Sequence, residues 1–313
     1  MISMDGVLVI DKPPGITSHG VVARARHILH ERRIGHTGTL DPFATGVLVI
    51  LLGKATRLAQ FLSGADKEYE AIIRLGYSTE TGDRTGNPIP GPDSAEAKLG
   101  KWSEQEIEQA LQSFRGEIDQ IPPMYSAKKV DGKKLYELAR RGESIERQPI
   151  HVCINELEAI RPEGQLIKDN LDGTFDFHVR VSCSSGTYIR TLAEDLGRRL
   201  YAGAHLAELR RTRVGDFSLG QAITLDALKV HFAEESLGAI LLPPNAALSR
   251  LPFVHLSAED VRRVNHGREV SVAEVDWTDG ENVKMCDANE QLIAIGQYEA
   301  AAKRLHPRVV LGG

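Results

Sequence analysis

The segment TFDFHVRVSC at residues 174–183 restricts the fold more than any other stretch of this sequence. Its apolar residues alternate strictly, which is typical of a strand with one buried face. The segment that follows, SSGTYIRTLAEDLGRRL, repeats its apolar residues at helical spacing. The sequence therefore predicts a strand that leads directly into a helix with a buried apolar face. The residues on the buried face of the strand are Phe175, Phe177, Val179, Val181 and Cys183.

The totals limit the class of protein. The chain has 313 residues, of which 42% are hydrophobic and 26% charged, enough for one large domain with a smaller one or for two of medium size. No apolar run is long enough to span a bilayer, and the N-terminus lacks the pattern of a signal peptide. Cys153, Cys183 and Cys286 form no Cys-x-x-Cys pair, which argues against a disulfide framework or a thiolate metal site. We therefore predict a cytoplasmic protein with no membrane association.

The charge is unevenly distributed along the chain. The net charge of −5 argues mildly against a nucleic-acid partner. Residues 1–62, however, carry seven basic and four acidic side chains, and residues 121–147 carry the same numbers, whereas residues 63–110 carry five basic and ten acidic ones. An acidic body with two basic patches fits a polyanion bound at one face, although ordinary solvated charge explains the pattern equally well.

Several helix boundaries and one linker can be predicted locally. Ser18 stands where the N-cap of an amphipathic helix belongs, and Ser103 with Glu106 forms a capping-box pattern. The proline-containing segment at 241–253 is a candidate linker. Beyond it we predict a small capped helix that ends at Gly267, followed by the strands of a β-rich module.

The segment RRIGHTGTLDPFATGVL, Arg32–Leu48, is a loop rich in glycine and threonine that leads into a buried strand. Its glycines have neither the spacing of a P-loop nor that of a dinucleotide-binding fingerprint, so a nucleotide cofactor is not expected. His36 and Asp41 are too few to form a metal site, and the elbow motif of a serine hydrolase is missing. We therefore predict neither a metal nor a cofactor.

What remains in this loop is a single carboxylate held by the backbone. Pro42 biases Asp41 toward an extended conformation, and the glycines allow close approach to a ligand. An aspartate is already ionised at neutral pH, so positioning alone could make it a nucleophile. The alternative is an Asx-Pro turn in which the acid is purely structural.

The segment QIPPMYSAKKVDGKKLYELARRG contains a turn pair, Asp131–Gly132, set between lysines and followed by a short helical stretch. A basic protrusion that also carries tyrosines could act as a clamp on a polyanion.

The motifs together resemble those of the TruB family of pseudouridine synthases. GVLVIDKPPGITS followed by RIGHTGTLDPFATGVLVI resembles the first two family motifs, and KEYEAIIRLG, FRGEIDQIPPMYSAKKVDGKKLYELARRG, CSSGTYIRTLAEDLG and AHLAELRRTRVG follow in the family's order. The resemblance covers Gly6–Phe217, and the tail from about Leu251 resembles the small RNA-binding PUA module. The insertion at Ile121–Gly142 is similar to that of the bacterial stand-alone type, not of the relatives that work with guide RNAs.

The resemblance implies a fold and an activity. The expected fold is α+β: a catalytic domain at residues 1–247 on a mixed, mostly antiparallel sheet, with a basic RNA-clamping insertion at 121–147, and a PUA-like domain at 251–313. The family isomerises uridine to pseudouridine in the T loop of tRNA, at conventional position 55. No cofactor is needed, because no atoms are gained or lost. We expect a monomer that binds the T arm of tRNA without a guide RNA or protein partner.

The resemblance also implies roles for individual residues. Asp41 corresponds to the nucleophile, which would attack either C1′ of the ribose or C6 of the base. Tyr69 corresponds to the tyrosine that stacks under the target uracil and can act as a base toward the sugar. Arg190 corresponds to the arginine that pairs with the catalytic carboxylate, while Tyr188 and Leu209 line the uracil site.

Further residues are implied around this site. By resemblance, His36 fills the gap left in the T loop when the uridine swings out of the stack. Lys12 matches the family's first motif, where it braces the catalytic loop. The expected contacts to the RNA backbone are Arg24, Arg32, Arg33, Lys128, Lys129, Lys133 and Lys134.

Three other functions remain open at this point. A non-catalytic tRNA-binding or RNA-folding protein could share the fold, although the set of Asp41, Tyr69 and Arg190 argues against it. A related synthase could modify another RNA or need a protein–RNA partner. A small-molecule hydrolase could use Asp41, but it would not need a basic hairpin or a tail module.

Overall fold

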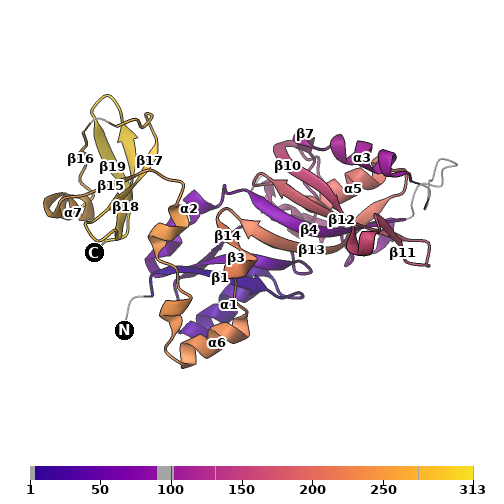
Figure 1. Ribbon diagram of the computed structural model, residues 1–313, viewed down its shortest axis with the longest axis horizontal. Helices are drawn as coiled ribbons and strands as arrows, with labels where there is room; N and C mark the ends of the chain where they lie inside the picture. Colours follow the sequence, from indigo (N-terminus) through magenta and orange to yellow (C-terminus); the bar gives the residue numbers. More distant parts are fainter. Residues whose placement is uncertain (1–3, 90–99, 101, 131, 274, 313) are drawn as a thin grey trace.

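A single mixed sheet runs through most of the molecule (Figure 1). The computed structural model describes residues 4–89, 100, 102–130, 132–273 and 275–312, and within these ranges the sheet has ten strands. The pairing of β3 with β13 is parallel and the other described pairings of this sheet are antiparallel, which confirms the predicted mixed, mostly antiparallel α+β fold. In spatial order its main strands are β1 (Gly6–Lys12), β3 (Thr45–Leu52), β13 (Ala204–Val214), β4 (Lys67–Leu75), β12 (Phe175–Cys183), β10 (Ile150–Ile160) and β7 (Gly116–Gln120).

The half of the sheet around β4 and β12 is covered by helices on one face. Two helices, α5 (Ile189–Arg199) and α3 (Glu104–Gln112), share a core with that face. Ile73 of β4, Val179 of β12 and Leu192 of α5 are fully buried there. The predicted strand at 174–183 and the helix after it are therefore confirmed, and the alternation arises because only one face of β12 packs on helices.

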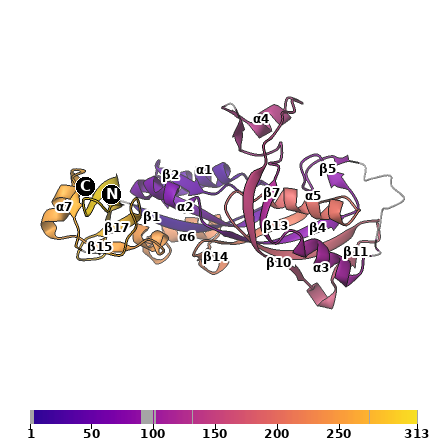
Figure 2. The same ribbon diagram turned by 90° about the horizontal axis from the view of Figure 1, so that it is seen from above.

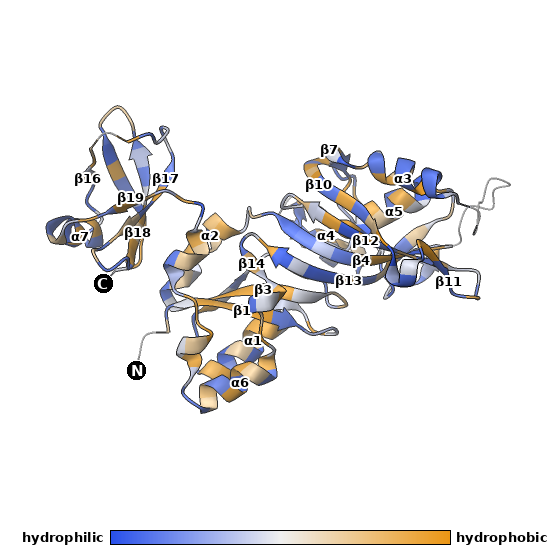
Figure 3. Cartoon of the chain, in the orientation of Figure 1, coloured by the Kyte–Doolittle hydropathy of each residue, from blue (hydrophilic) through white to orange (hydrophobic). Residues whose placement is uncertain are grey.

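The half around β1 and β3 is covered on both faces. Leu48 and Ile50 of β3 pack toward α1 and α6, whereas Val47 and Val49 pack toward α2. Burial on both faces explains why this strand is one continuous apolar run, and β1 has a similar hydrophobic colour in Figure 3. The helices concerned are α1 (Ser18–Leu29), α2 (Ala59–Leu62) and α6 (Leu225–Ala233).

The predicted N-cap of α1 is wrong by one residue. Thr17 is the N-cap, and its hydroxyl accepts a hydrogen bond from the Gly20 amide at 2.9 Å. The buried Ser18 hydroxyl instead accepts from the Leu40 amide at 2.8 Å and donates to the Leu40 carbonyl at 3.1 Å. The hydroxyl of Ser18 thus ties the start of α1 to the loop that carries Asp41, a partner that only the folded chain supplies.

The basic insertion projects from the sheet, as Figure 2 shows. Strands β8 (Lys129–Val130) and β9 (Lys133–Lys134) pair as a two-stranded ribbon, and α4 (Leu135–Ala139) follows. Gly132 has a φ of +79°, as the tight turn requires, and Asp131 lies outside the described residues.

The C-terminal part forms a second sheet with one helix. The predicted helix ending at Gly267 is confirmed as α7 (Ala258–Asn265), and its N-cap Ser257 accepts from the Asp260 amide. The segment predicted as a linker is not an exposed tether. It contains a 3₁₀ helix at Pro244–Leu248, whose Ala247 and Leu248 are buried in a core shared by both sheets. The strands of this second sheet are, in spatial order, β15 (Phe253–His255), β17 (Asn282–Cys286), β18 (Leu292–Glu299), β19 (Arg304–Val310) and β16 (Val270–Ser271).

Short elements complete the described part of the chain, and the predicted capping box of Ser103 and Glu106 is present at α3. No helix in the described ranges is long and apolar enough to cross a membrane. The remaining strands are β2 (Ile34–Thr37), β5 (Ser78–Thr79), β6 (Pro88–Ile89), β11 (Ile167–Asp169) and β14 (Phe217–Ser218), and the remaining 3₁₀ helices are Gly53–Leu58, Pro162–Gly164, Leu219–Gln221 and Leu237–Ala239.

Candidate active site

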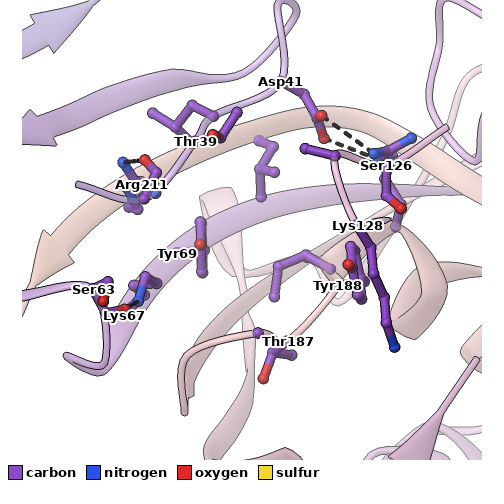
Figure 4. A pocket seen from close by; sticks show the side chains of 17 residues that line it. Thr39, Asp41, Ser63, Lys67, Tyr69, Ser126, Lys128, Thr187, Tyr188 and Arg211 are labelled. Carbon is purple, nitrogen blue, oxygen red and sulfur yellow. Dashed lines mark hydrogen bonds and ion pairs between the residues drawn. The ribbon is translucent and has the colours of Figure 1, made fainter. Parts of the chain in front are cut away.

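A pocket of about 270 Å³ lies where the Asp41 loop, β4, β13, the start of α5 and the root of the insertion meet (Figure 4). It brings together several of the residues predicted from sequence, although these are far apart in the chain. The predicted residues that line it are Asp41, Tyr69, Lys128, Tyr188, Arg190 and Leu209.

Lys12 holds the loop that carries Asp41 in place through hydrogen bonds to backbone carbonyls. Lys12 is fully buried, and its ammonium donates to the carbonyls of Pro13 at 2.9 Å and Pro42 at 3.2 Å. The Pro42 carbonyl also accepts from the Gly15 amide at 2.8 Å. Burial lowers the pKa of Lys12 to about 8, and the neighbouring Asp41 carboxylate partly opposes that shift.

Arg190 forms a two-point ion pair with Asp41. Its Nε lies 3.0 Å from Asp41 Oδ2 and its Nη2 lies 3.2 Å from Oδ1. The arginine side chain is 7% exposed and the aspartate side chain 32%, so the carboxylate keeps one open side toward the pocket. A planar guanidinium in this geometry fixes both the position and the orientation of the carboxylate.

Arg190 is in turn held by groups from two other segments, the loop that contains Thr81 and Asp83 and the segment that contains Tyr125. It donates from Nη1 to the Thr81 carbonyl at 2.9 Å and from Nη2 to the Tyr125 carbonyl at 2.7 Å. Its Nη1 also lies 3.9 Å from Oδ2 of Asp83, which is buried. Asp83 is a site residue that the sequence reasoning missed, because it belongs to a loop with no recognisable motif.

Two opposing effects act on the Asp41 carboxyl group. Burial raises its pKa above the ordinary aspartate value, and the Asp83 charge adds to that rise. The positive charge and hydrogen bonds of Arg190 lower the pKa and so favour the ionised form. The ionised state of Asp41 therefore depends on Arg190.

The opposite wall of the pocket is aromatic and apolar. Tyr69 from β4 is 6% exposed, and Leu209 from β13 is 7% exposed. Tyr188 precedes α5 and is half-buried. Burial raises the pKa of both phenols, so the two rings are uncharged at neutral pH. This wall suits a flat, neutral ring more than an ion.

Two cationic residues in the pocket were not predicted. Arg211 is fully buried and donates to the Val47 carbonyl at 2.8 Å and the Gly38 carbonyl at 3.0 Å, which joins the Asp41 loop to β3. Lys67 donates to two backbone carbonyls, and burial, with the Arg211 charge, lowers its pKa to about 8. The signal for Arg211 was available, since residues two apart on a strand share a face and Leu209 was predicted to line the site.

His36 does not line this pocket. It lies in β2, with its ring edge-on to His19 at a centroid distance of 5.1 Å, and its Nδ1 has no hydrogen-bond partner among the described residues. Burial lowers its pKa to about 4, and the neighbouring His19 and Arg211 side chains add to that effect. The ring is therefore neutral at physiological pH.

The predicted RNA-backbone residues lie in two groups. Arg24, on α1, and Arg32 and Arg33, just after it, are exposed. Lys129 and Lys133 are exposed on the ribbon of the insertion. Lys128, which was predicted to contact the RNA backbone, lines the pocket instead of lying on the ribbon.

The arrangement can position one carboxylate against a flat, uncharged ring. Within the described residues no group of three or more His, Cys, Asp or Glu could hold a metal ion. A fixed carboxylate of this kind is suited either to nucleophilic attack or to pairing with a positive charge.

The whole chain is similar to a family of RNA-modifying enzymes. Residues 26–189 match the model of the TruB family pseudouridylate synthase N-terminal domain, residues 190–249 that of the tRNA pseudouridylate synthase B C-terminal domain, and residues 252–311 that of the pseudouridine synthase II TruB C-terminal region.

Curated relatives and solved structures agree with these models. The tRNA pseudouridine synthase B of Azoarcus sp. (strain BH72) is 42% identical over 301 residues, covering 96% of this chain and 93% of the relative. That of Aromatoleum aromaticum is 47% identical over 265 residues, covering 85% and 80%. Among solved structures, a chain of an H/ACA ribonucleoprotein bound to a substrate RNA containing 2′-deoxyuridine is 28% identical with a TM-score of 0.74, covering 99% of this chain and 86% of that chain.

Proposed function

This chain belongs to the TruB family of pseudouridine synthases, and on that premise we propose that it isomerises a uridine in the T loop of tRNA, with Asp41 as the nucleophile. The enzyme is a pseudouridine synthase, and pseudouridylation of tRNA is the activity for which its relatives are named. The observation that carries the finer proposal is the two-point ion pair of Arg190 with Asp41 at the edge of a pocket lined by tyrosines.

The reaction rearranges bonds without net gain or loss of atoms. The N1–C1′ bond of the uridine breaks, the uracil turns, and a bond forms between C5 and C1′. C5 loses its proton and N1 gains one, so the product is an isomer of the substrate. Asp41 attacks either C1′ of the ribose or C6 of the base and is released when the new bond is complete.

The aromatic wall holds the uracil while it turns. We assign Tyr69 to stack against the ring, with Leu209 and Tyr188 closing the site around it. Burial raises the pKa of the Tyr69 phenol, which favours the stacking role over that of a base toward the sugar. Lys12 braces the catalytic loop by donating a hydrogen bond to the Pro42 carbonyl.

The uridine must leave the T-loop stack before its C1′ and C5 become accessible. Flipping a nucleotide out of a stack costs a few kcal/mol. We assign His36 to the space that the uridine vacates. Because burial lowers its pKa to about 4, the imidazole is uncharged and can stack as a flat ring.

The basic residues of α1 and the insertion are assigned to the phosphates of the T arm. We further propose that the enzyme acts as a monomer and without a guide RNA. Phosphate contacts make affinity depend steeply on salt, whatever the net charge of the protein.

The double substitution Lys129→Gln/Lys133→Gln is expected to weaken tRNA binding without slowing the chemistry at saturating enzyme. The slope of log K against log salt should fall in magnitude by about 1.5, since each phosphate contact contributes about 0.7–0.9. Filter binding at several salt concentrations measures the slope, and single-turnover assays measure the rate. The matched control is Lys168→Gln/Lys229→Gln, which removes two exposed lysines on β11 and α6. Equal slopes for the two double variants would show that Lys129 and Lys133 of the insertion do not contact phosphates of the tRNA.

The proposed site of modification can be tested by chemical mapping. After incubation of an unmodified tRNA transcript with the enzyme, carbodiimide treatment, alkaline removal of the adducts on other bases and primer extension should give one new stop, one nucleotide 3′ of the T-loop uridine. A stop elsewhere in the tRNA would keep the family assignment and overturn the T-loop proposal.

A further inference from the structure

The root of the basic insertion is bonded to the start of the helix that carries Arg190. Gln120 is the last residue of β7, and its side chain is buried, with only 1% exposed. Its Oε1 accepts from the Tyr188 amide at 2.9 Å, and its Nε2 donates to the Tyr188 carbonyl at 3.3 Å. One side-chain amide thus pairs with both backbone groups of one residue.

Tyr188 lies where the pocket wall meets the start of α5. Tyr188 is the N-cap of α5, with extended backbone and no side-chain capping bond of its own. Its ring lines the pocket, and Arg190 follows two residues later. A shift of the Tyr188 backbone would therefore move both the aromatic wall and the guanidinium that orients Asp41.

The residues after Gln120 reinforce the same junction. The Tyr125 carbonyl accepts from Arg190 Nη2 at 2.7 Å. The Ile121 carbonyl accepts from the hydroxyl of Thr191, in the first turn of α5, at 3.4 Å. Ser126 is buried and lines the pocket, as Tyr188 does. The segment at 120–126 and the first turn of α5 therefore form one hydrogen-bonded unit.

We propose that Gln120 is a positioning residue for the isomerisation: its amide holds the Tyr188 backbone so that Arg190 meets Asp41 in the reactive geometry. The proposal rests on the proposed function of this site. Gln120 is buried and is not among the residues that line the pocket, so its loss should change the rate of the chemical step and not the affinity for tRNA. Displacing a catalytic group by about 1 Å can cost on the order of 100-fold in rate.

Two substitutions separate positioning from simple packing. Gln120→Leu keeps the bulk and removes both hydrogen bonds, and it is expected to slow single-turnover pseudouridine formation by about 10- to 100-fold with a tRNA Kd within about threefold of the wild type. Gln120→Glu keeps the acceptor for the Tyr188 amide, but its carboxylate faces the Tyr188 carbonyl until it is protonated. Its rate relative to the wild type should therefore rise as the pH falls from 8 to 5.5, whereas the Gln120→Leu ratio stays flat.

The control is Gln148→Leu, at an exposed glutamine between the insertion and β10, which should behave as the wild type. Thermal unfolding of each variant shows that it is folded at the assay temperature. Wild-type rates in Gln120→Leu, a loss confined to Kd, or a flat pH ratio for Gln120→Glu would each overturn the positioning role. If the wild type itself forms no pseudouridine in tRNA, the proposed function fails as well, so the two failures are distinguishable.

Discussion

Asp41→Asn is expected to abolish pseudouridine formation in tRNA, with a rate loss of at least about 10⁴-fold, as for other enzymes that lose their nucleophile. The asparagine amide nearly matches the carboxylate in shape, so the loop that Lys12 and Arg190 hold should keep its place. The substitution removes the carboxylate oxygen that forms the covalent bond to the substrate. Nucleoside analysis of digested tRNA after single-turnover incubation measures the remaining rate.

The same substitution should leave the affinity for tRNA almost unchanged. Contacts to phosphates dominate affinity for RNA, so the tRNA Kd of Asp41→Asn should stay within about threefold of the wild type. Asp226→Asn, at an exposed acid in the first turn of α6, controls for a change of one unit in net charge. Substantial turnover by Asp41→Asn would remove Asp41 as the nucleophile and restore its alternative role in an Asx-Pro turn.

Arg190→Ala is expected to lower the rate by about 100-fold, because the Asp41 carboxylate loses the group that orients it and a misplacement of about 1 Å can cost about 100-fold in rate. Arg190→Lys keeps the charge but cannot reproduce the two bonds to the carboxylate, so its rate should fall between those of the wild type and Arg190→Ala. Thermal unfolding is the necessary control, since Arg190 also bonds the Thr81 and Tyr125 carbonyls.

The pH profile of Arg190→Ala gives a second, independent result. The reactive form of Asp41 is the carboxylate, so activity falls as the pH drops through its pKa. Burial raises that pKa and Arg190 lowers it, so the loss of Arg190 leaves the upward effect unopposed. The acid limb of kcat/KM should therefore move to higher pH in Arg190→Ala. An acid limb that stays in place would show that the arginine does not control the ionisation of Asp41.

The sequence predicted best what depends on local pattern. The alternation at 174–183 and the helical spacing after it follow from packing on one face only, and both elements are present as β12 and α5. The helix at α7 was predicted from its capping serine, because a cap satisfies backbone amides within the same turn. The two-stranded ribbon of the insertion was predicted from its turn pair, Asp131–Gly132.

The sequence failed where a side chain serves a partner distant in the chain. Ser18 and Thr17 are equivalent as local caps, and only the Leu40 backbone, brought near by folding, distinguishes them. Gln120 looks like an ordinary polar residue at the end of a strand until Tyr188, 68 residues away, is placed against it. The prolines at 243 and 244 suggested a linker, but the apolar Ala247 and Leu248 beside them are buried in the core shared by the two sheets.

We propose above all that Asp41 drives formation of a C5–C1′ bond at one uridine of the T loop. The most direct test is tritium release from a tRNA transcript labelled with [5-³H]uridine, because the C5 hydrogen is lost when that bond forms. Wild type should release tritium, while Asp41→Asn with the same transcript, and wild type with a transcript whose T-loop uridine is replaced by cytidine, should not. No release by wild-type enzyme that still binds tRNA would contradict the account and leave a non-catalytic RNA-binding protein of the same fold.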